Sequence, residues 1–309
     1  MEGDKRPADH PSQPQQDKKK TQLSDIFVDK IVDQSTLNIF FLTDWHLNKP
    51  FAEKLKAWYL AQEKRDVDLV VLGGDFDNLN EQSFAKEAEN DESEMRISTF
   101  LTFLEFFCCP IYYIPGNHDP PTMFSPDDRV AKTHSLSQFS HNVHKRIQKV
   151  LSGLSIVGIG GSIPALKTNL KTGDSEFIWS SYPYEKDADM EPDLTFVSSL
   201  IDATEDQVIF LSHNGPDALS TTLYSLDEGE KIVAGAPSLT KFLLKHSDKI
   251  LLNLHGHCHP GQGMKKLNTS VVLNGGAFCF GEFAKARLVK IEGVWKVQNC
   301  SFHDLNAVN

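Results

Sequence analysis

The sequence predicts an α/β fold whose functional site lies at the carboxyl ends of its sheet strands. Two observations lead to this prediction. Short apolar runs with strand character alternate with longer segments of helical periodicity, and no linker rich in Pro, Gly or Ser divides the chain. The chain has 309 residues, of which 40% are hydrophobic, so it is long enough to bury the core of one large domain. We therefore expect a single α/β domain over residues 25–309.

Seven apolar runs have the length and composition of buried strands. Each is short and ends at a polar residue or at Gly, as expected for strands that are covered on both faces. The runs are residues 37–43, 67–72, 110–114, 154–159, 208–211, 250–254 and 270–273. Near the carboxyl end, the segment from Ala286 to Val297 predicts a hairpin that turns at Glu292-Gly293.

Two of the intervening segments have helical periodicity. Residues 51–65 repeat Phe51, Leu55 and Trp58 at helical spacing, and residues 91–107 carry apolar residues at the same spacing behind an acidic start. We expect the aromatic side chains of both segments to lie in the core rather than against a ligand.

Composition excludes several classes of function. The formal net charge is -11 and the pI is near 5.5, which argues against binding to nucleic acid or to an anionic membrane surface and suits a protein that binds divalent cations. No apolar stretch approaches the ~20 residues of a membrane-spanning helix.

The amino-terminal residues predict a disordered polar tail. Residues 1–24 are rich in Pro, Gln, Lys and Asp and contain no apolar region of the kind that a signal peptide has. The five cysteines are odd in number and form no CxxC, which suits reduced thiols. We therefore expect a cytoplasmic protein without disulfides.

Polar residues with metal-binding chemistry follow five of the apolar runs. Because ligands collect outside the carboxyl ends of strands in layered sheets, we expect these residues to converge in space. The five segments are Asp44-Trp45-His46, Gly74-Asp75, Gly116-Asn117-His118-Asp119, His213-Asn214 and Gly256-His257-Cys258-His259.

The last segment raises a question of its own. In LHGHCHP the residues His255, His257 and His259 alternate, so an extended backbone places all three side chains on one face. Alternating histidines are compatible with a metal site and with a solvated edge, and spacing alone does not choose which of the three bind. Cys258 points away from that face and is expected in the core.

Together, the five segments resemble the pattern DxH, GD, GNH[DE], H, GHxH of the calcineurin-like metallophosphoesterase family. The resemblance spans residues 44–259. It implies a four-layer α/β/β/α sandwich of two mostly mixed sheets, with a dinuclear metal site at the strand carboxyl ends.

The resemblance also implies the metal ligands. Matching the family pattern residue by residue assigns Asp44, His46 and His259 to a first metal, Asn117, His213 and His257 to a second metal, and Asp75 to a bridge between them. His255 then lies outside the pattern, although the pairing of His255 with His257 is an alternative that the alternation permits.

Mixed Asp, Asn and His ligands suit two divalent transition metal ions, namely Mn, Fe or Zn. A water shared by two such ions ionises near neutral pH and attacks phosphorus in line. His118 matches the general acid of the family, and Asp77 or Asn78 is expected to orient it.

The expected function is hydrolysis of phosphate monoesters or diesters of a small phosphorylated molecule or nucleotide. The alternative is a non-catalytic scaffold that keeps the fold and binds protein partners. The arginines of the protein serine/threonine phosphatase branch are absent from the matching positions, where Leu79 and Pro120-Pro121 stand. Substrate selection is expected in residues 120–150 and 164–193, whose basic and aromatic residues are also compatible with a solvated face and a core patch.

Overall fold

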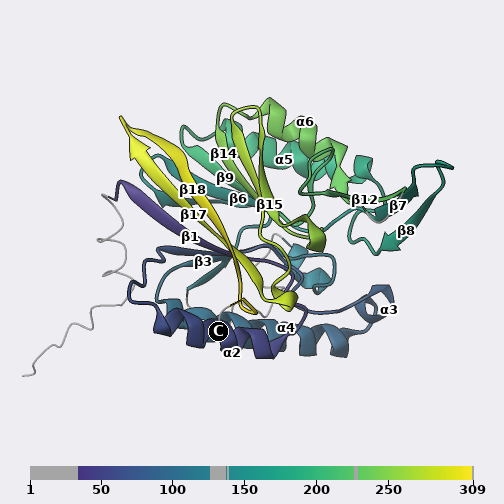
Figure 1. Ribbon diagram of the computed structural model, residues 1–309, viewed down its shortest axis with the longest axis horizontal. Helices are drawn as coiled ribbons and strands as arrows, with labels where there is room; N and C mark the ends of the chain where they lie inside the picture. Colours follow the sequence, from purple (N-terminus) through teal and green to yellow (C-terminus); the bar gives the residue numbers. More distant parts are fainter. Residues whose placement is uncertain (1–33, 126–136, 138, 226–228, 308–309) are drawn as a thin grey trace, which may run out of the picture. The chain divides into compact units, whose positions relative to one another are not determined.

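Two six-stranded mixed sheets form the centre of the fold (Figure 1). The computed structural model describes residues 34–125, 137, 139–225 and 229–307, so the tail predicted over residues 1–24 lies outside the described residues. Residues 35–309 form one unit. Among the described residues, no helix combines the length and apolar character that crossing a membrane requires.

The first sheet has the strand order β18-β17-β1-β2-β3-β4. Strands β1 to β4 are parallel to one another, and β17 and β18 add an antiparallel hairpin next to β1. Its strands are β1 (Thr36–Leu42), β2 (Leu69–Leu72), β3 (Ile111–Tyr113), β4 (Ser140–Asn142), β17 (Glu282–Ile291) and β18 (Val294–Asp304).

The second sheet has the order β15-β16-β14-β9-β6-β5. Its four central strands are parallel, and an antiparallel strand closes each edge. Its strands are β5 (Ile147–Leu151), β6 (Leu154–Ile159), β9 (Gln207–Ser212), β14 (Ile250–His255), β15 (Gly263–Leu267) and β16 (Ser270–Asn274). Two further sheets are smaller: β11 (Leu223–Ser225), β12 (Glu230–Val233), β7 (Ala165–Asn169) and β8 (Ser175–Trp179) form one, and β10 (Gly215–Pro216) with β13 (Gly235–Ala236) the other.

Helices cover the outer face of each large sheet, which gives four layers in the order α/β/β/α (Figure 1). Helices α2 and α4 pack on the first sheet, and α5 and α6 pack on the second. The helices are α2 (Lys49–Ala61), α3 (Glu81–Phe84), α4 (Glu87–Leu104), α5 (Glu191–Asp202) and α6 (Pro237–Lys245), with 3₁₀ turns η1 (Glu105–Phe107), η2 (Pro121–Phe124), η4 (Asp187–Met190), η5 (His259–Gly261) and η6 (Phe278–Phe280). The predicted fold class is confirmed.

Strand β1 shows why the two sheets stack. Phe40 and Leu42 belong to the core beneath α2 and α4, whereas Ile39 and Phe41 are equally buried on the opposite face of the strand. Because side chains alternate across a strand, Ile39 and Phe41 point toward the second sheet. A strand that is apolar on both faces requires cover on both faces, which the second sheet and the helices provide.

All seven predicted strands correspond to strands of the large sheets, and the hairpin turn at Glu292-Gly293 is confirmed by the positive φ angles of both residues. Helix α2 ends four residues earlier than predicted, at Ala61. Helix α4 begins four residues earlier, at Glu87, and its last predicted turn is η1. The sequence analysis missed the edge strands β4, β5 and β15 and the small sheet that includes β7 and β8, because it identified strands only from short runs that are apolar throughout. It also missed the helices α5 and α6.

His144 lies buried where the end of β4 meets β6, and it generates a prediction about stability. Its Nδ1 accepts a hydrogen bond from Gly160 N–H at 2.8 Å, and burial lowers its pKa from 6.5 to about 3. The unfolded chain therefore binds a proton at this position below pH 6.5 that the folded chain does not bind. This difference costs stability as the pH falls from 6.5 toward 3, by up to about 1.4 kcal/mol per pH unit.

We expect His144→Gln to remove this contribution, because a glutamine side chain does not titrate. The free energy of unfolding, measured in urea at pH 7, 6 and 5, should decrease less steeply with falling pH in the variant than in the unchanged protein. Equal slopes for the two proteins would show that His144 is not the buried neutral group described here.

Candidate metal centre

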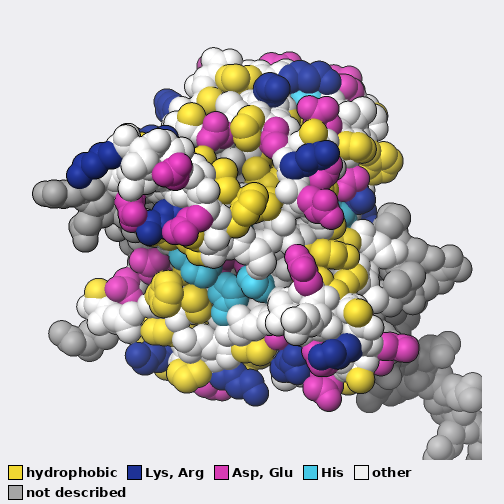
Figure 2. Space-filling view, turned by 90° about the vertical axis from the view of Figure 1, so that its right-hand side faces the viewer, with side chains coloured by type: hydrophobic (Ala, Val, Ile, Leu, Met, Phe, Trp, Pro, Cys, Tyr) yellow, Lys and Arg dark blue, Asp and Glu magenta, His cyan; other side chains and the backbone are white. Residues whose placement is uncertain are grey.

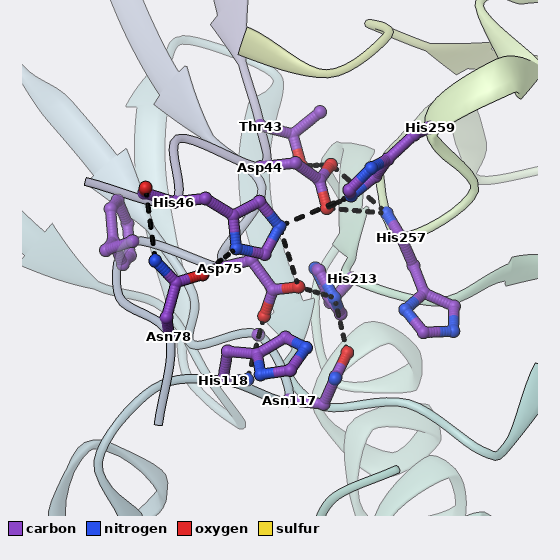
Figure 3. A network of polar contacts seen from close by, with 12 residues as sticks. Thr43, Asp44, His46, Asp75, Asn78, Asn117, His118, His213, His257 and His259 are labelled. Atoms are coloured by element: carbon purple, nitrogen blue, oxygen red, sulfur yellow. Dashed lines mark hydrogen bonds and ion pairs between the residues drawn. The ribbon is translucent and has the colours of Figure 1, made fainter. Parts of the chain in front are cut away.

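Histidine side chains gather on the floor of a hollow in the surface (Figure 2). The residues of this site follow strands of both large sheets: Asp44 follows β1, Asp75 follows β2, Asn117 follows β3, and His213 follows β9. The fifth contributing segment, after β14, carries His257 and His259. Because each sheet presents the carboxyl ends of its parallel strands at one edge, stacking the two sheets brings all five segments together (Figure 3).

Asp44, His46 and His259 form a first group of candidate ligands. One ligand atom from each residue lies within 4.8 Å of the others. His259 Nε2 lies 3.3 Å from Asp44 Oδ1 and also 3.3 Å from His46 Nε2. The three residues come from two segments more than 200 residues apart, and the structure brings them together as the resemblance implied.

Asp75, His213 and His257 form a second group, again with ligand atoms within 4.8 Å of one another. His213 Nε2 lies 3.3 Å from Asp75 Oδ2 and 2.9 Å from Asn117 Oδ1. The same Asp75 oxygen lies 3.7 Å from His46 Nε2 in the first group. Asp75 therefore stands between the two groups.

Two of the candidate ligands, His46 and His213, are held with Nε2 toward the centre. His46 Nδ1–H donates to Asn78 Oδ1, and His213 Nδ1–H donates to Gly73 O, each at 2.8 Å. A carbonyl oxygen accepts only from a protonated nitrogen, so in the neutral ring the lone pair is on Nε2. This arrangement is typical of metal-binding histidines.

The ionisation of these groups follows from burial and their mutual charges. Burial opposes the charged form of Asp44, but the hydrogen bond with His259 and the charges of His259 and His213 hold its pKa at about 2. Burial acts in the same direction on Asp75, yet the charges of His213 and His118 hold its pKa well below the ordinary value. Burial lowers the pKa of His257 to about 3, so this ring is neutral.

The donor set fits divalent cations. His257 Nε2 is buried and has no hydrogen-bond partner among the described residues. The Nε2 atoms of His46 and His259 lie 3.3 Å apart. In the neutral ring of His46 this Nε2 carries a lone pair, because Nδ1–H donates to Asn78, so two ring nitrogens that each carry a lone pair would repel each other. Only a proton or a cation between such atoms removes their repulsion, and a mixed set of carboxylate, amide and imidazole donors suits borderline divalent ions.

Backbone strain is concentrated at these residues. Asp44, His46, Asp75 and His257 have φ angles of 57°, 48°, 55° and 65°, in the left-handed region. This conformation costs on the order of 1–3 kcal/mol at a residue other than Gly, and such strain persists where the surrounding structure imposes it. The hydrogen bonds from Asp44 N–H to Gly74 O and from His46 N–H to Asp75 O, each 3.0 Å, impose it here.

Two glycines give the ligand segments room to approach one another. A Cβ atom on Gly256 would overlap the hydroxyl of Thr43, and one on Gly116 would overlap the carboxylate of Asp75. The glycines of the GNHD and GHxH segments are therefore required by close packing around the ligands.

His118 lies beside Asp75 and the first ligand group. Its backbone N–H donates to Asp75 Oδ1 at 2.9 Å, and its ring centroid lies 5.4 Å from that of His46. The prediction that Asp77 or Asn78 orients His118 is corrected by the contacts of these residues. His118 Nδ1–H donates to the carbonyl oxygen of Leu79 at 2.8 Å instead.

The side chains of Asp77 and Asn78 instead fix the ring of His46, a candidate ligand. Asn78 Oδ1 accepts from the ring of His46, and Asp77 Oδ1 accepts from Asn78 N–H at 2.7 Å. Asp77 Oδ2 in turn accepts from Nε and Nη2 of Arg96 on α4, at 2.9 and 2.7 Å. The sequence analysis missed Arg96, because nothing in a helical pattern indicates which buried carboxylate a distant arginine will contact.

Asp119 was also missed, although the sequence contained a signal for it. It is fully buried and its carboxylate accepts from the backbone N–H groups of Phe76, Asp77 and Gly116. These hydrogen bonds tie the segment after β2 to the segment after β3. The acidic residue that ends GNHD therefore holds the loops that carry Asp75 and Asn117.

His255 belongs to neither ligand group. It is fully buried, its Nδ1–H donates to Gly256 O at 3.1 Å, and its ring packs against Gly215. The pairing of His257 with His213, and of His259 with Asp44, is the arrangement that the GHxH frame implied. Cys258 is buried in an apolar cluster with Ala165, as predicted.

A cavity of about 240 Å³ opens over the ligands. Its lining comprises His46, Asp75, Asn117, His118, Ile178, Trp179, Ser180, His257 and His259. Residues 164–193 thus contribute to the cavity through β8 and the residue after it. No described residue of 120–150 lines it.

The sequence profile described as calcineurin-like phosphoesterase matches residues 37–261. The chain belongs to this family, which also contains non-catalytic members. A search of the curated proteins finds no match.

The solved structures to which this chain is similar have low sequence identity. The TT1561 protein of Thermus thermophilus is 18% identical, with a TM-score of 0.55 over 87% of this chain and 99% of that chain. The phosphopantetheinyl hydrolase of Mycobacterium tuberculosis is 15% identical, with a TM-score of 0.46 over 79% of this chain and 90% of that chain. At 18% identity the likeness to TT1561 shows the fold alone.

The two ligand groups generate a prediction for three histidines. We expect His257→Ala to deplete mainly the second group of metal and His259→Ala mainly the first, because each removes one ligand atom from one group. His255→Ala should keep its metal and change activity only indirectly, by at most about 10–100-fold. Metal stoichiometry of the three variants checks this, and a depleted His255→Ala beside an intact His259→Ala would reverse the assignment.

Arg96 generates a second prediction. Without its guanidinium the charge on Asp77 is unpaired, and the chain of hydrogen bonds through Asn78 no longer fixes His46. We expect Arg96→Gln to weaken metal binding at the first group by about 10–100-fold. The measurement is a titration against a chelating dye in a His257→Ala background, where only the first group keeps all its ligands.

The matched control is Glu92→Gln. Glu92 is another acidic partner of Arg96, at 3.7 Å, but its side chain is 76% exposed, whereas that of Asp77 is 3% exposed. Metal affinity that falls equally in Glu92→Gln and Arg96→Gln would contradict a specific role of the Asp77 contact.

Proposed function

We propose that this protein hydrolyses phosphate esters of a small phosphorylated molecule or nucleotide, with two divalent transition metal ions (Mn, Fe or Zn). Asp44, His46 and His259 would hold the first ion. Asn117, His213 and His257 would hold the second, with Asp75 as the shared ligand. When bound, two such ions ionise water near neutral pH and offset the negative charge of the phosphoryl oxygens.

The position of His118 carries the proposal. Its backbone N–H binds Asp75, so the ring is held next to the ligands, and its side chain lines the same cavity. Because Nδ1–H donates to the carbonyl oxygen of Leu79, Nε2 is the nitrogen that is free to exchange a proton. We assign His118 as the general acid that protonates the leaving oxygen, a role worth about 10²–10⁴-fold in rate.

A non-catalytic scaffold is the alternative, and two observations favour an enzyme over it. A scaffold has no need of a histidine that lines a cavity with Nε2 available. It also has no need of strained backbone at four candidate ligands, because such strain costs stability and would bring a scaffold no benefit. We place the activity in the cytoplasm, as the reduced character expected of the cysteines suggests.

The proposal is tested with metal-stripped protein to which Mn, Zn or Fe is returned. The substrates are p-nitrophenyl phosphate, bis-p-nitrophenyl phosphate, and cyclic and linear nucleotides. We expect hydrolysis that requires metal and is lost in Asp75→Asn, which should also bind less of both ions because Asp75 serves each. Metal-loaded protein that hydrolyses none of these substrates would support the scaffold instead.

The role of His118 is tested by leaving-group dependence. We expect His118→Ala to retain metal and to lose activity mainly on alkyl esters, because a leaving group with a high pKa requires a proton and p-nitrophenolate does not. The rates of matched p-nitrophenyl and alkyl esters give the comparison. An equal loss on both would identify His118 as a positioning residue.

A further inference from the structure

Trp179, with Ile178 and Ser180 next to it, forms one wall of the cavity beside two of the candidate ligands. The ring of Trp179 lies 5.6 Å from that of His257 and 6.0 Å from that of His259, measured between centroids. The plane of Trp179 is inclined by 28° to that of His259, so the indole lies roughly parallel to this ring, and Trp179 lines the cavity. Ile178 and Ser180 line the cavity next to it.

A bulge in β8 directs the side chains of Ile178 and Trp179 toward the cavity. Ala165 of β7 pairs with Trp179, but the next residue, Leu166, pairs with Phe177, so Ile178 is an extra residue on β8. In a regular strand neighbouring side chains point to opposite faces, and a bulge changes this locally. Ile178 and Trp179 both reach the cavity as a result, while Phe177 is 76% exposed outside it.

The wall is fixed to the rest of the site. Ile178 and Trp179 pack against a buried cluster that includes Ala165 and Cys258, the residue between the two ligand histidines. The carbonyl oxygen of Ser180 accepts from Asn117 Nδ2 at 3.2 Å. Trp179 is therefore held in place before any substrate arrives, which lowers the entropy cost of binding against it.

The charge of the lining favours one class of phosphate ester. No described lining residue is Lys or Arg. Lys167, two strand positions beyond Ala165 on β7, is paired with Glu230 at 2.9 Å and with Glu176 at 3.6 Å. A diester carries one negative charge and a monoester two near neutral pH. The second charge of a monoester would meet no Lys or Arg among the described lining residues.

We propose that Trp179 binds the ester group that stays on phosphorus, and that the preferred substrates are phosphodiesters whose retained group is a flat aromatic ring, such as a nucleobase or an aryl group. This inference rests on the proposed function. His118 lies beside the ring of His46, whereas Trp179 lies beside those of His257 and His259. We therefore assign the leaving group to the side of His118 and the retained group to the side of Trp179. A monoester has no second substituent for Trp179 to bind.

The reaction is balanced by one water molecule. The oxygen of water forms a bond to phosphorus and the bond to the leaving oxygen breaks. The leaving oxygen takes the proton of His118. One proton of the water stays on the new phosphate oxygen and the other reprotonates His118, so that diester and water give monoester and alcohol. The product that remains against Trp179 is the aryl or nucleoside monoester.

The test compares two diesters with the same leaving group, p-nitrophenyl phenyl phosphate and methyl p-nitrophenyl phosphate. Stacking of an aromatic group on Trp179 should contribute at least about fivefold to kcat/KM for the phenyl diester. We expect Trp179→Leu to reduce the phenyl-to-methyl ratio of kcat/KM by that factor, and Trp179→Phe to keep most of it because a flat ring remains.

Phe177→Leu is the matched control, because it makes the same kind of change two residues away on β8, outside the cavity. Its ratio should equal that of the unchanged protein, and metal content and melting temperature show whether each variant is folded. Hydrolysis of both diesters with a ratio that Trp179→Leu leaves unchanged would overturn the Trp179 subsite and leave the proposed function standing. Metal-loaded protein that hydrolyses p-nitrophenyl phosphate but neither diester would overturn the inference alone, and protein that hydrolyses none of the substrates tested would overturn both.

Discussion

The carboxylate of Asp75 is the group on which the whole centre depends. It is buried, lies between the two ligand groups, and accepts the backbone N–H of His118. A buried negative charge is costly unless cations or hydrogen-bond donors surround it. Three histidines from three different segments, His46, His118 and His213, approach this one carboxylate. Gly116 leaves the space that the carboxylate occupies.

The sandwich supplies the rigidity that this crowding requires. Each large sheet is covered by helices on one face and by the other sheet on its second face, so the strand ends cannot move independently. The ligands themselves stand on short segments with left-handed backbone just beyond those strands. Packing of the apolar strands is what stabilises the strained segments, because the hydrogen bonds of Asp119 and of the ligand backbones hold them only while the strands stay in place.

Two kinds of support reach the centre from outside the ligand segments. Arg96 on α4 fixes the orientation of His46 through Asp77 and Asn78, so a helix of the outer layer contributes to ligand geometry. Trp179 comes from the small sheet, whose bulged strand places an aromatic side chain against the rings of His257 and His259. The contacts of Arg96 affect the geometry of the candidate ligands, whereas Trp179 is the proposed binding surface for the retained group of the substrate. Arg96 thus acts on the centre only through Asp77 and Asn78, whereas Trp179 itself lines the cavity.

The sequence by itself determined the central strands of both sheets and the family pattern, because short apolar runs and the polar residues after them are local signals. It therefore predicted which segments carry the candidate ligands. Only the tertiary structure decided that His255 lies outside both ligand groups, since alternation alone permits either pairing. The tertiary structure also decided which side chains Asp77 and Asn78 contact, and that Trp179 lies beside His257 and His259. Each depends on how a helix or a bulged strand far away in the sequence packs, and side-chain spacing contains no information about such contacts.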